Sequence, residues 1–212
     1  MQTRPQSAGE EIANSISHGI GALAAAAAAP VLIMAALQRG GAATVVGASL
    51  FATTLLLMYL ASTLYHALPR NRAKRIFQIF DHTAISLLIA GTYTPFTLGV
   101  LQGAWGWTLF GLVWGLALTG ILYKVFGKGQ HTHFSTLLYL AMGWLVVIAI
   151  KPLWQSMPGW GLFWLAAGGL AYTIGVIFYV LDNRVHYSHF IWHLFVLAGS
   201  SSHFIAVLRY SG

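Results

Sequence analysis

The sequence contains no cysteine among its 212 residues, which excludes disulfide bonds, thiolate metal ligands and a cysteine nucleophile. Charged residues are also scarce, because Asp, Glu, Lys and Arg together make up 7% of the chain, against about 25% in an ordinary soluble domain. Hydrophobic residues reach 58%, and the mean hydropathy is +0.72. A soluble protein of this size needs polar residues to cover its surface. The composition therefore excludes a soluble domain and indicates a chain embedded in lipid.

Seven apolar stretches are each long enough to cross a bilayer, which requires roughly 20 mostly apolar residues in a helix. They cover residues 13–37, 43–67, 79–101, 105–125, 134–151, 160–181 and 187–208. Short breaks rich in glycine, proline or basic residues separate them, so neighbouring spans should run antiparallel. We predict an all-α membrane protein in which residues 1–212 form one domain, a bundle of seven transmembrane helices.

The basic residues indicate how this bundle is oriented. The chain has 11 Lys and Arg but only four Asp and Glu, a formal net charge of +7. In a soluble protein this excess would suggest nucleic-acid binding, but here most basic residues lie between the spans, so no nucleic-acid partner is expected. With the N-terminus inside, eight basic residues face the cytoplasm (Arg4, Arg70, Arg72, Lys74, Arg75, Lys124, Lys128 and Arg184) and three face outward (Arg39, Lys151 and Arg209). This bias predicts a cytoplasmic N-terminus.

Ionisable residues inside membrane spans are costly and usually functional. Ser62 and His66 stand four residues apart near the end of the second span, and His189 and His193 repeat this spacing at the start of the seventh. Residues four apart share one face of a helix. Asp81 lies near the start of the third span. Under the predicted topology these five groups reach the same, cytoplasmic level of the bundle.

Three imidazoles with one open coordination position are a common arrangement for catalytic zinc. We therefore expect His66, His189 and His193 to bind Zn²⁺, with Asp81 and Ser62 close enough to orient a water molecule or accept its proton. The alternative interpretation of each histidine taken alone is an interfacial residue at a helix end.

Other polar residues have simpler interpretations. Glu11 and His18 enter the bundle from the same side, and they could support the zinc ligands from behind or gate access to them. We expect His131 and His133 to be solvated in a loop. His203 lies too far along the last helix to join the other ligands, and we expect it to bond a neighbouring helix.

Small residues and one proline bear on helix packing. The pairs Gly111 with Gly115 and Gly99 with Gly103 have the four-residue spacing that permits helices to approach closely. Pro95, inside the third span, predicts a bend there, because proline frees a backbone carbonyl that neighbouring groups must then satisfy.

Several stretches resemble the bacterial hemolysin III family, which lies within the superfamily of progestin and adipoQ receptors and is more remotely related to alkaline ceramidases. They are EEIANSISHGIG (10–21), ASTLYHALP (61–69), FDHTAISLLIAGTYTPF (80–96), YLAMGW (139–144), GVIFYV (175–180) and HFIWH (189–193). The resemblance extends from about residue 10 to residue 208. It implies zinc ligation by His66, His189 and His193, with Asp81 and Ser62 near a zinc-bound water. It also implies a seven-helix bundle with a cytoplasmic N-terminus in the bacterial plasma membrane.

Two classes of function remain open from the sequence. The first is a zinc-dependent hydrolase whose partner is a membrane lipid, with an amide as the expected substrate. The second is a non-catalytic protein in which zinc stabilises the bundle and which acts as a sensor, a regulator of membrane homeostasis or a cytolytic factor. A proton or ion pathway through the same buried groups is a third hypothesis. The sequence specifies neither the substrate nor the oligomeric state.

Overall fold

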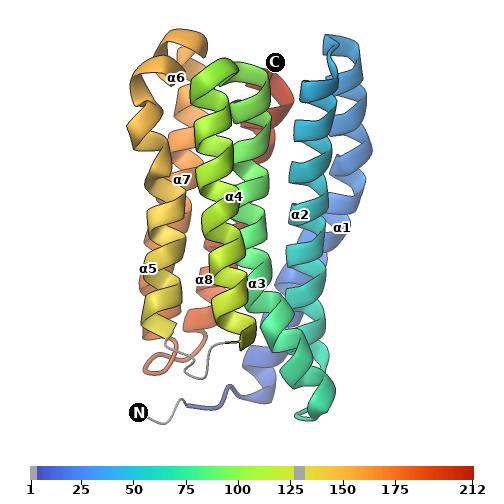
Figure 1. Cartoon of the computed structure of the whole chain (residues 1–212). Helices are drawn as coiled ribbons and strands as arrows, with labels where there is room; N and C mark the ends of the chain where they lie inside the picture. Colours follow the sequence, from blue (N-terminus) through green and yellow to red (C-terminus); the bar gives the residue numbers. More distant parts are fainter. Residues whose placement is uncertain (1–3, 127–131) are drawn as a thin grey trace.

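The computed structural model describes residues 4–126 and 132–212, and this part of the chain contains helices and no strand (Figure 1). The elements are α1 (Ala8–Arg39), α2 (Ala42–Ala67), α3 (Arg72–Pro95), α4 (Gly103–Phe126), α5 (Thr132–Gly143), α6 (Ile150–Ser156), α7 (Gly159–Leu181) and α8 (Ser188–Tyr210). A π-helical segment, Phe96–Leu101, extends α3, and a 3₁₀ segment, Trp144–Ala149, joins α5 to α6. Seven of the resulting helical segments are long and apolar enough to cross a membrane, which confirms the predicted fold class.

Two helices begin earlier than the hydropathy of the sequence suggests. The third span starts at Arg72 rather than residue 79, because the Asn71 side chain accepts a hydrogen bond from the Lys74 backbone N–H at 3.0 Å and caps the helix. The first span starts at Ala8, where Ser7 and Glu10 form a reciprocal capping box. Helix ends depend on such caps, whereas hydropathy marks only the part of a helix that lies in lipid.

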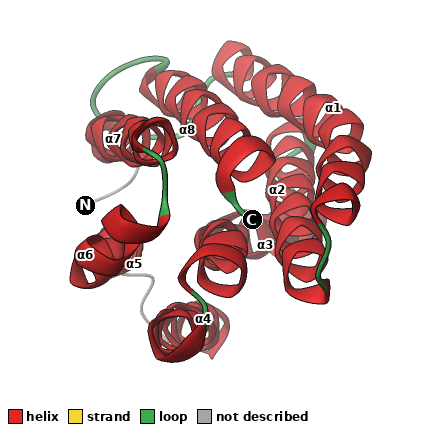
Figure 2. Ribbon diagram, turned by 90° about the horizontal axis from the view of Figure 1, so that it is seen from above, coloured by secondary structure: helices red, strands yellow, loops and turns green. Residues whose placement is uncertain are grey.

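Helix α1 packs beside two other helices, α2 and α8 (Figure 2). Helix α2 packs closely against α1 and α3, and α8 packs against α7 and α1. The backbones of α2 and α8 rarely lie close together, but the Tyr59 hydroxyl of α2 bonds Ser200 of α8. The closest approach of α2 and α3 requires glycine, because a Cβ at Gly91 would overlap the Thr54 side chain. By contrast, a Cβ at Gly111 or Gly115 would meet no atom within 4 Å, so the prediction that this pair serves helix packing is wrong.

The distribution of side chains is the reverse of that in a soluble protein. Large apolar residues lie on the outside, with Leu23 75% exposed and Leu137 66% exposed. Polar residues such as Asn14 and Thr94 are completely buried. This arrangement suits lipid as the surrounding solvent, in which apolar surface costs nothing and polar groups must be satisfied internally.

Candidate metal centre

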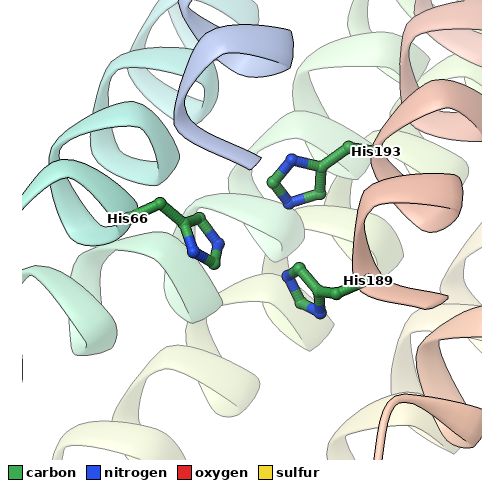
Figure 3. Close-up of side chains that lie close together, drawn as sticks. All are labelled: His66, His189 and His193. Atoms are coloured by element: carbon green, nitrogen blue, oxygen red, sulfur yellow. The ribbon is translucent and has the colours of Figure 1, made fainter. Parts of the chain in front are cut away.

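Three histidines from two helices meet inside the bundle, at the end where the chain begins. His66 lies in the last turn of α2, and His189 and His193 lie one turn apart at the start of α8. Each offers one nitrogen atom such that the three nitrogens lie within 4.8 Å of one another. Figure 3 shows the three rings turned toward a common point. All three side chains are buried, so a metal ion held there would be shielded from bulk water.

The second ring nitrogen of each histidine lies close to a polar group on another segment. Nδ1 of His66 is 2.8 Å from a carboxylate oxygen of Glu11. Nδ1 of His193 is 3.1 Å from Ser17 Oγ and 3.2 Å from the backbone carbonyl oxygen of Asn14. A histidine that binds a metal usually donates its other N–H to such an acceptor, which fixes the tautomer and the ring orientation.

A carboxylate in the loop between α7 and α8 lies close to His189. An Asp182 carboxylate oxygen is 3.3 Å from His189 Nδ1, although this nitrogen makes no hydrogen bond to the described residues. Burial alone would raise the pKa of Asp182, but the nearby His189 ring, the Gln6 side chain and the charge of Arg4 together hold that pKa below its usual value. Asp182 is therefore an anion at neutral pH, suited to accept a hydrogen bond from a neutral imidazole.

In His66 and His193 these contacts leave Nε2 as the ligand atom. The Nε2 atom of His66 is buried and has no hydrogen-bond partner among the described residues. A buried polar atom without a partner costs about 1–3 kcal/mol. A metal ion would remove this cost, so the arrangement fits a metal held by three neutral imidazoles.

A cavity of about 520 Å³ runs beside His189 and His193. Its walls are mostly apolar and come mainly from α3, α5, α7 and α8. The ionisable groups on its walls include His18, Asp81, His82, His189 and His193, and Ser62 lines it as well. The opposite end of the cavity is lined by Leu101, Leu153 and Leu162. The cavity thus joins a polar, potentially metal-binding end to a long apolar compartment.

Comparison with known proteins agrees with this architecture. The family model described as Haemolysin-III related matches residues 6–204. Hemolysin-3 of Bacillus cereus is 45% identical over 99% of this chain and 95% of its own length, and the Hemolysin-3 homolog of Bacillus subtilis (strain 168) is 48% identical over 95% and 94%. The chain belongs to the hemolysin III family. A more distant relative, the human monocyte to macrophage differentiation factor, is 27% identical over 74% of this chain and 66% of its own length.

In this hemolysin III protein the two residues predicted beside the ligands line the same cavity as His189 and His193. Ser62 is 1% exposed, and its hydroxyl has no hydrogen-bond partner among the described residues. Asp81 is 8% exposed and, like Ser62, lines the cavity. Both groups are therefore available to a molecule that enters the cavity.

Two residues to which the sequence assigned a minor role touch the ligands directly. Glu11 bonds His66, as described above, and also forms an ion pair with Lys74 at 2.9 Å. The His18 ring stacks on His193, with 3.5 Å between the ring centroids and 4° between the ring planes. Neither nitrogen of His18 has a hydrogen-bond partner among the described residues.

The remaining histidines lie apart from the group of three. His203 Nε2 is 3.3 Å from the backbone carbonyl oxygen of Leu165 on α7, which confirms that it bonds a neighbouring helix. His186 is exposed, and its Nδ1 lies 3.2 Å from Arg4. The solvation expected of His131 and His133 stays a prediction, because residue 131 and the side chain of His133 lie outside the described structure.

The sequence does not predict a place for Asp182 beside the histidines, because this residue lies in the short break between the last two spans. The available signal was its position seven residues before His189, in a chain with four acidic residues in total. That position alone does not reveal contact with a histidine, because the loop must first turn back over the start of α8.

Proposed function

We propose that this protein is a zinc-dependent hydrolase that cleaves an amide bond in a membrane lipid. One observation carries the proposal. Three buried imidazoles face one another, two of them line an apolar cavity, and the Asp81 carboxylate and the Ser62 hydroxyl, which has no hydrogen-bond partner among the described residues, line the same cavity.

The donor set favours zinc over harder cations. Three neutral nitrogen ligands and no thiolate suit zinc, whereas magnesium and calcium prefer oxygen ligands. Three protein ligands also leave one position open, as in catalytic rather than structural zinc sites. When bound, zinc would acidify water to give a nucleophile at neutral pH and would polarise the substrate carbonyl.

The residues around the cavity would supply the other roles. The Asp81 carboxylate would accept the proton of the attacking water and later deliver it to the leaving amine nitrogen. The Ser62 hydroxyl would donate a hydrogen bond to the oxygen on which negative charge develops. The apolar walls would hold the hydrocarbon chains and exclude bulk water from the reacting bond.

We further propose that the three histidines lie at the cytoplasmic side of the bacterial plasma membrane. Support comes from the excess of basic residues at the end of the bundle that holds the N-terminus, which the positive-inside rule assigns to the cytoplasm. The substrate would then be drawn from the inner leaflet.

A second candidate function is non-catalytic, and the helix packing favours it. Because the backbones of α2 and α8 rarely lie close together and the Tyr59–Ser200 hydrogen bond links them elsewhere, a metal ion shared by His66, His189 and His193 would add a second direct link between them. Such a protein could act as a sensor, a regulator of membrane homeostasis or a cytolytic factor. The last role is consistent with relatives that carry the name Hemolysin-3.

The experiment that separates the two functions uses purified protein in lipid nanodiscs. Zinc content is measured first by elemental analysis, and the zinc-loaded protein is then incubated with a panel of lipids that includes ceramide-like amides. Released fatty acid and amine are followed by mass spectrometry. The hydrolase hypothesis predicts turnover that is lost in His193→Ala and in Asp81→Asn.

A cavity-filling variant and a matched control test whether turnover requires the cavity. Gly169 lines the cavity and a Cβ there would meet no atom within 4 Å, so Gly169→Trp should fill the cavity and block lipid binding without straining the backbone. Gly111→Trp is the matched control, because Gly111 has equally open surroundings on the outer face of α4. Turnover no greater than that of His193→Ala across the whole panel would rule out the hydrolase and favour the clamp.

A further inference from the structure

Helix α1 connects the two helices that carry the three histidines. It packs against α2, which carries His66, and against α8, which carries His189 and His193 (Figure 2). The backbones of α2 and α8 rarely lie close together, although the Tyr59 hydroxyl of α2 bonds Ser200 of α8. The separation and rotation of these two helices therefore depend in part on α1, which packs against both. The relative placement of the three imidazoles is thus sensitive to α1.

One face of α1 touches histidines on both neighbours. Residues 11, 14 and 18 follow one another at intervals of three and four, the spacing that places side chains on one side of a helix. Glu11 bonds His66 at 2.8 Å, the Asn14 carbonyl oxygen lies 3.2 Å from His193 Nδ1, and the His18 ring stacks on the same histidine. The first three turns of α1 thus contact His66 on one side and His193 on the other.

We propose that this face of α1 positions the metal ligands, and that Glu11 is its principal positioning residue. The inference rests on the proposed zinc site. The Glu11 carboxylate accepts the N–H of His66 Nδ1, which keeps the lone pair on Nε2 and turns that atom toward His189 and His193. A carboxylate behind a metal-bound imidazole also makes the imidazole a stronger ligand.

A purely structural role for Glu11 makes a different prediction. Glu11 also pairs with Lys74 on α3, so it could serve only to fasten α1 to α3. In that case removing Lys74 should have the same consequences as removing Glu11. If Glu11 acts through His66, only the loss of Glu11 should weaken metal binding, because Lys74 contacts Glu11, backbone carbonyl groups and the Tyr65 ring but none of the three histidines.

The test compares wild type, Glu11→Ala, Glu11→Gln and Lys74→Gln as full-length proteins in nanodiscs. The dissociation constant for zinc is measured by competition with a chromophoric chelator, and the visible spectrum of the cobalt-substituted protein reports the ligand geometry. The melting temperature of the metal-free protein reports any general loss of packing.

We expect Glu11→Ala to weaken zinc binding about 10–100-fold and to alter the cobalt spectrum. Glu11→Gln keeps an acceptor oxygen and should recover part of that loss. Lys74→Gln should lower the melting temperature of the metal-free protein while its zinc affinity stays at or above that of wild type. Unchanged zinc affinity in Glu11→Ala, or equal losses in Glu11→Ala and Lys74→Gln, would overturn the positioning role and leave the proposed zinc site intact. If the wild type itself bound no zinc, both proposals would fall.

Discussion

Removing the metal should lower the thermal stability of this protein by a calculable amount. His66 and the pair His189 and His193 come from helices far apart in the sequence, so an unfolded chain cannot hold them together. Zinc should therefore bind the folded bundle far better than the unfolded chain. A ligand of this kind at about 100 times its dissociation constant stabilises the fold by about 2.7 kcal/mol. For a chain of this length, that corresponds to a rise in melting temperature of roughly 5–11 °C.

The assay is a melting curve of the purified protein with and without a zinc chelator, repeated on two variants. His66→Ala should melt at the same temperature with and without zinc, because two imidazoles remain. His203→Ala is the matched control, since this histidine lies on α8 outside the group of three and bonds only the Leu165 carbonyl oxygen among the described residues. It should melt earlier than wild type but keep the full shift on zinc removal. A chelator-dependent shift that survives in His66→Ala would refute the assignment of His66 as a ligand.

Three further predictions concern packing in the bundle. Gly91→Leu should destabilise the bundle by about 1–3 kcal/mol in a denaturation titration, because its side chain would overlap Thr54 across the α2–α3 contact. His18→Phe, which preserves the ring stacked on His193, should keep the zinc affinity of wild type, whereas His18→Ala should weaken it; equal affinities in the two variants would contradict a stacking role. Arg39→Ala removes hydrogen bonds to carbonyl groups at the end of α8 and should lower the unfolding free energy by about 0.5–1 kcal/mol with unchanged zinc stoichiometry.

Most of the fold could be predicted from the sequence because lipid imposes a simple requirement. Each spanning segment must satisfy its backbone hydrogen bonds internally and present apolar side chains outward, so hydropathy and length together mark seven helices. The ends of the helices could not be predicted in this way. The first turns of α3 carry Arg72, Lys74 and Arg75 and are not apolar, yet they are helical because Asn71 caps them.

The three histidines could be predicted because their positions need only helix periodicity and alternating helix direction. Two residues four apart share a face of a helix. An odd number of connections between spans separates α2 from α8, so the end of α2 and the start of α8 lie on the same side of the membrane. The neighbours of the histidines were harder to predict. Whether Glu11 and His18 face the bundle depends on the rotation of α1 about its axis, and a helix whose apolar residues surround it gives no clear signal of that rotation.

The placement of negative charge gives an independent argument for a cation at this site. The chain has only four acidic residues and keeps a net charge of +7, so its carboxylates are too few to neutralise its basic residues. Glu11 and Asp182 contact His66 and His189, Asp81 lines the adjoining cavity, and Glu10 is engaged by Arg4 at 2.6 Å. Lys74 pairs with Glu11 and the charge of Arg4 acts on Asp182, so two of these carboxylates already have a basic neighbour. Asp81 forms no ion pair among the described residues, and a buried carboxylate is costly without a nearby positive charge. A divalent cation held by the three histidines would place that charge at the same end of the cavity as Asp81, which supports a metal site independently of the ligands.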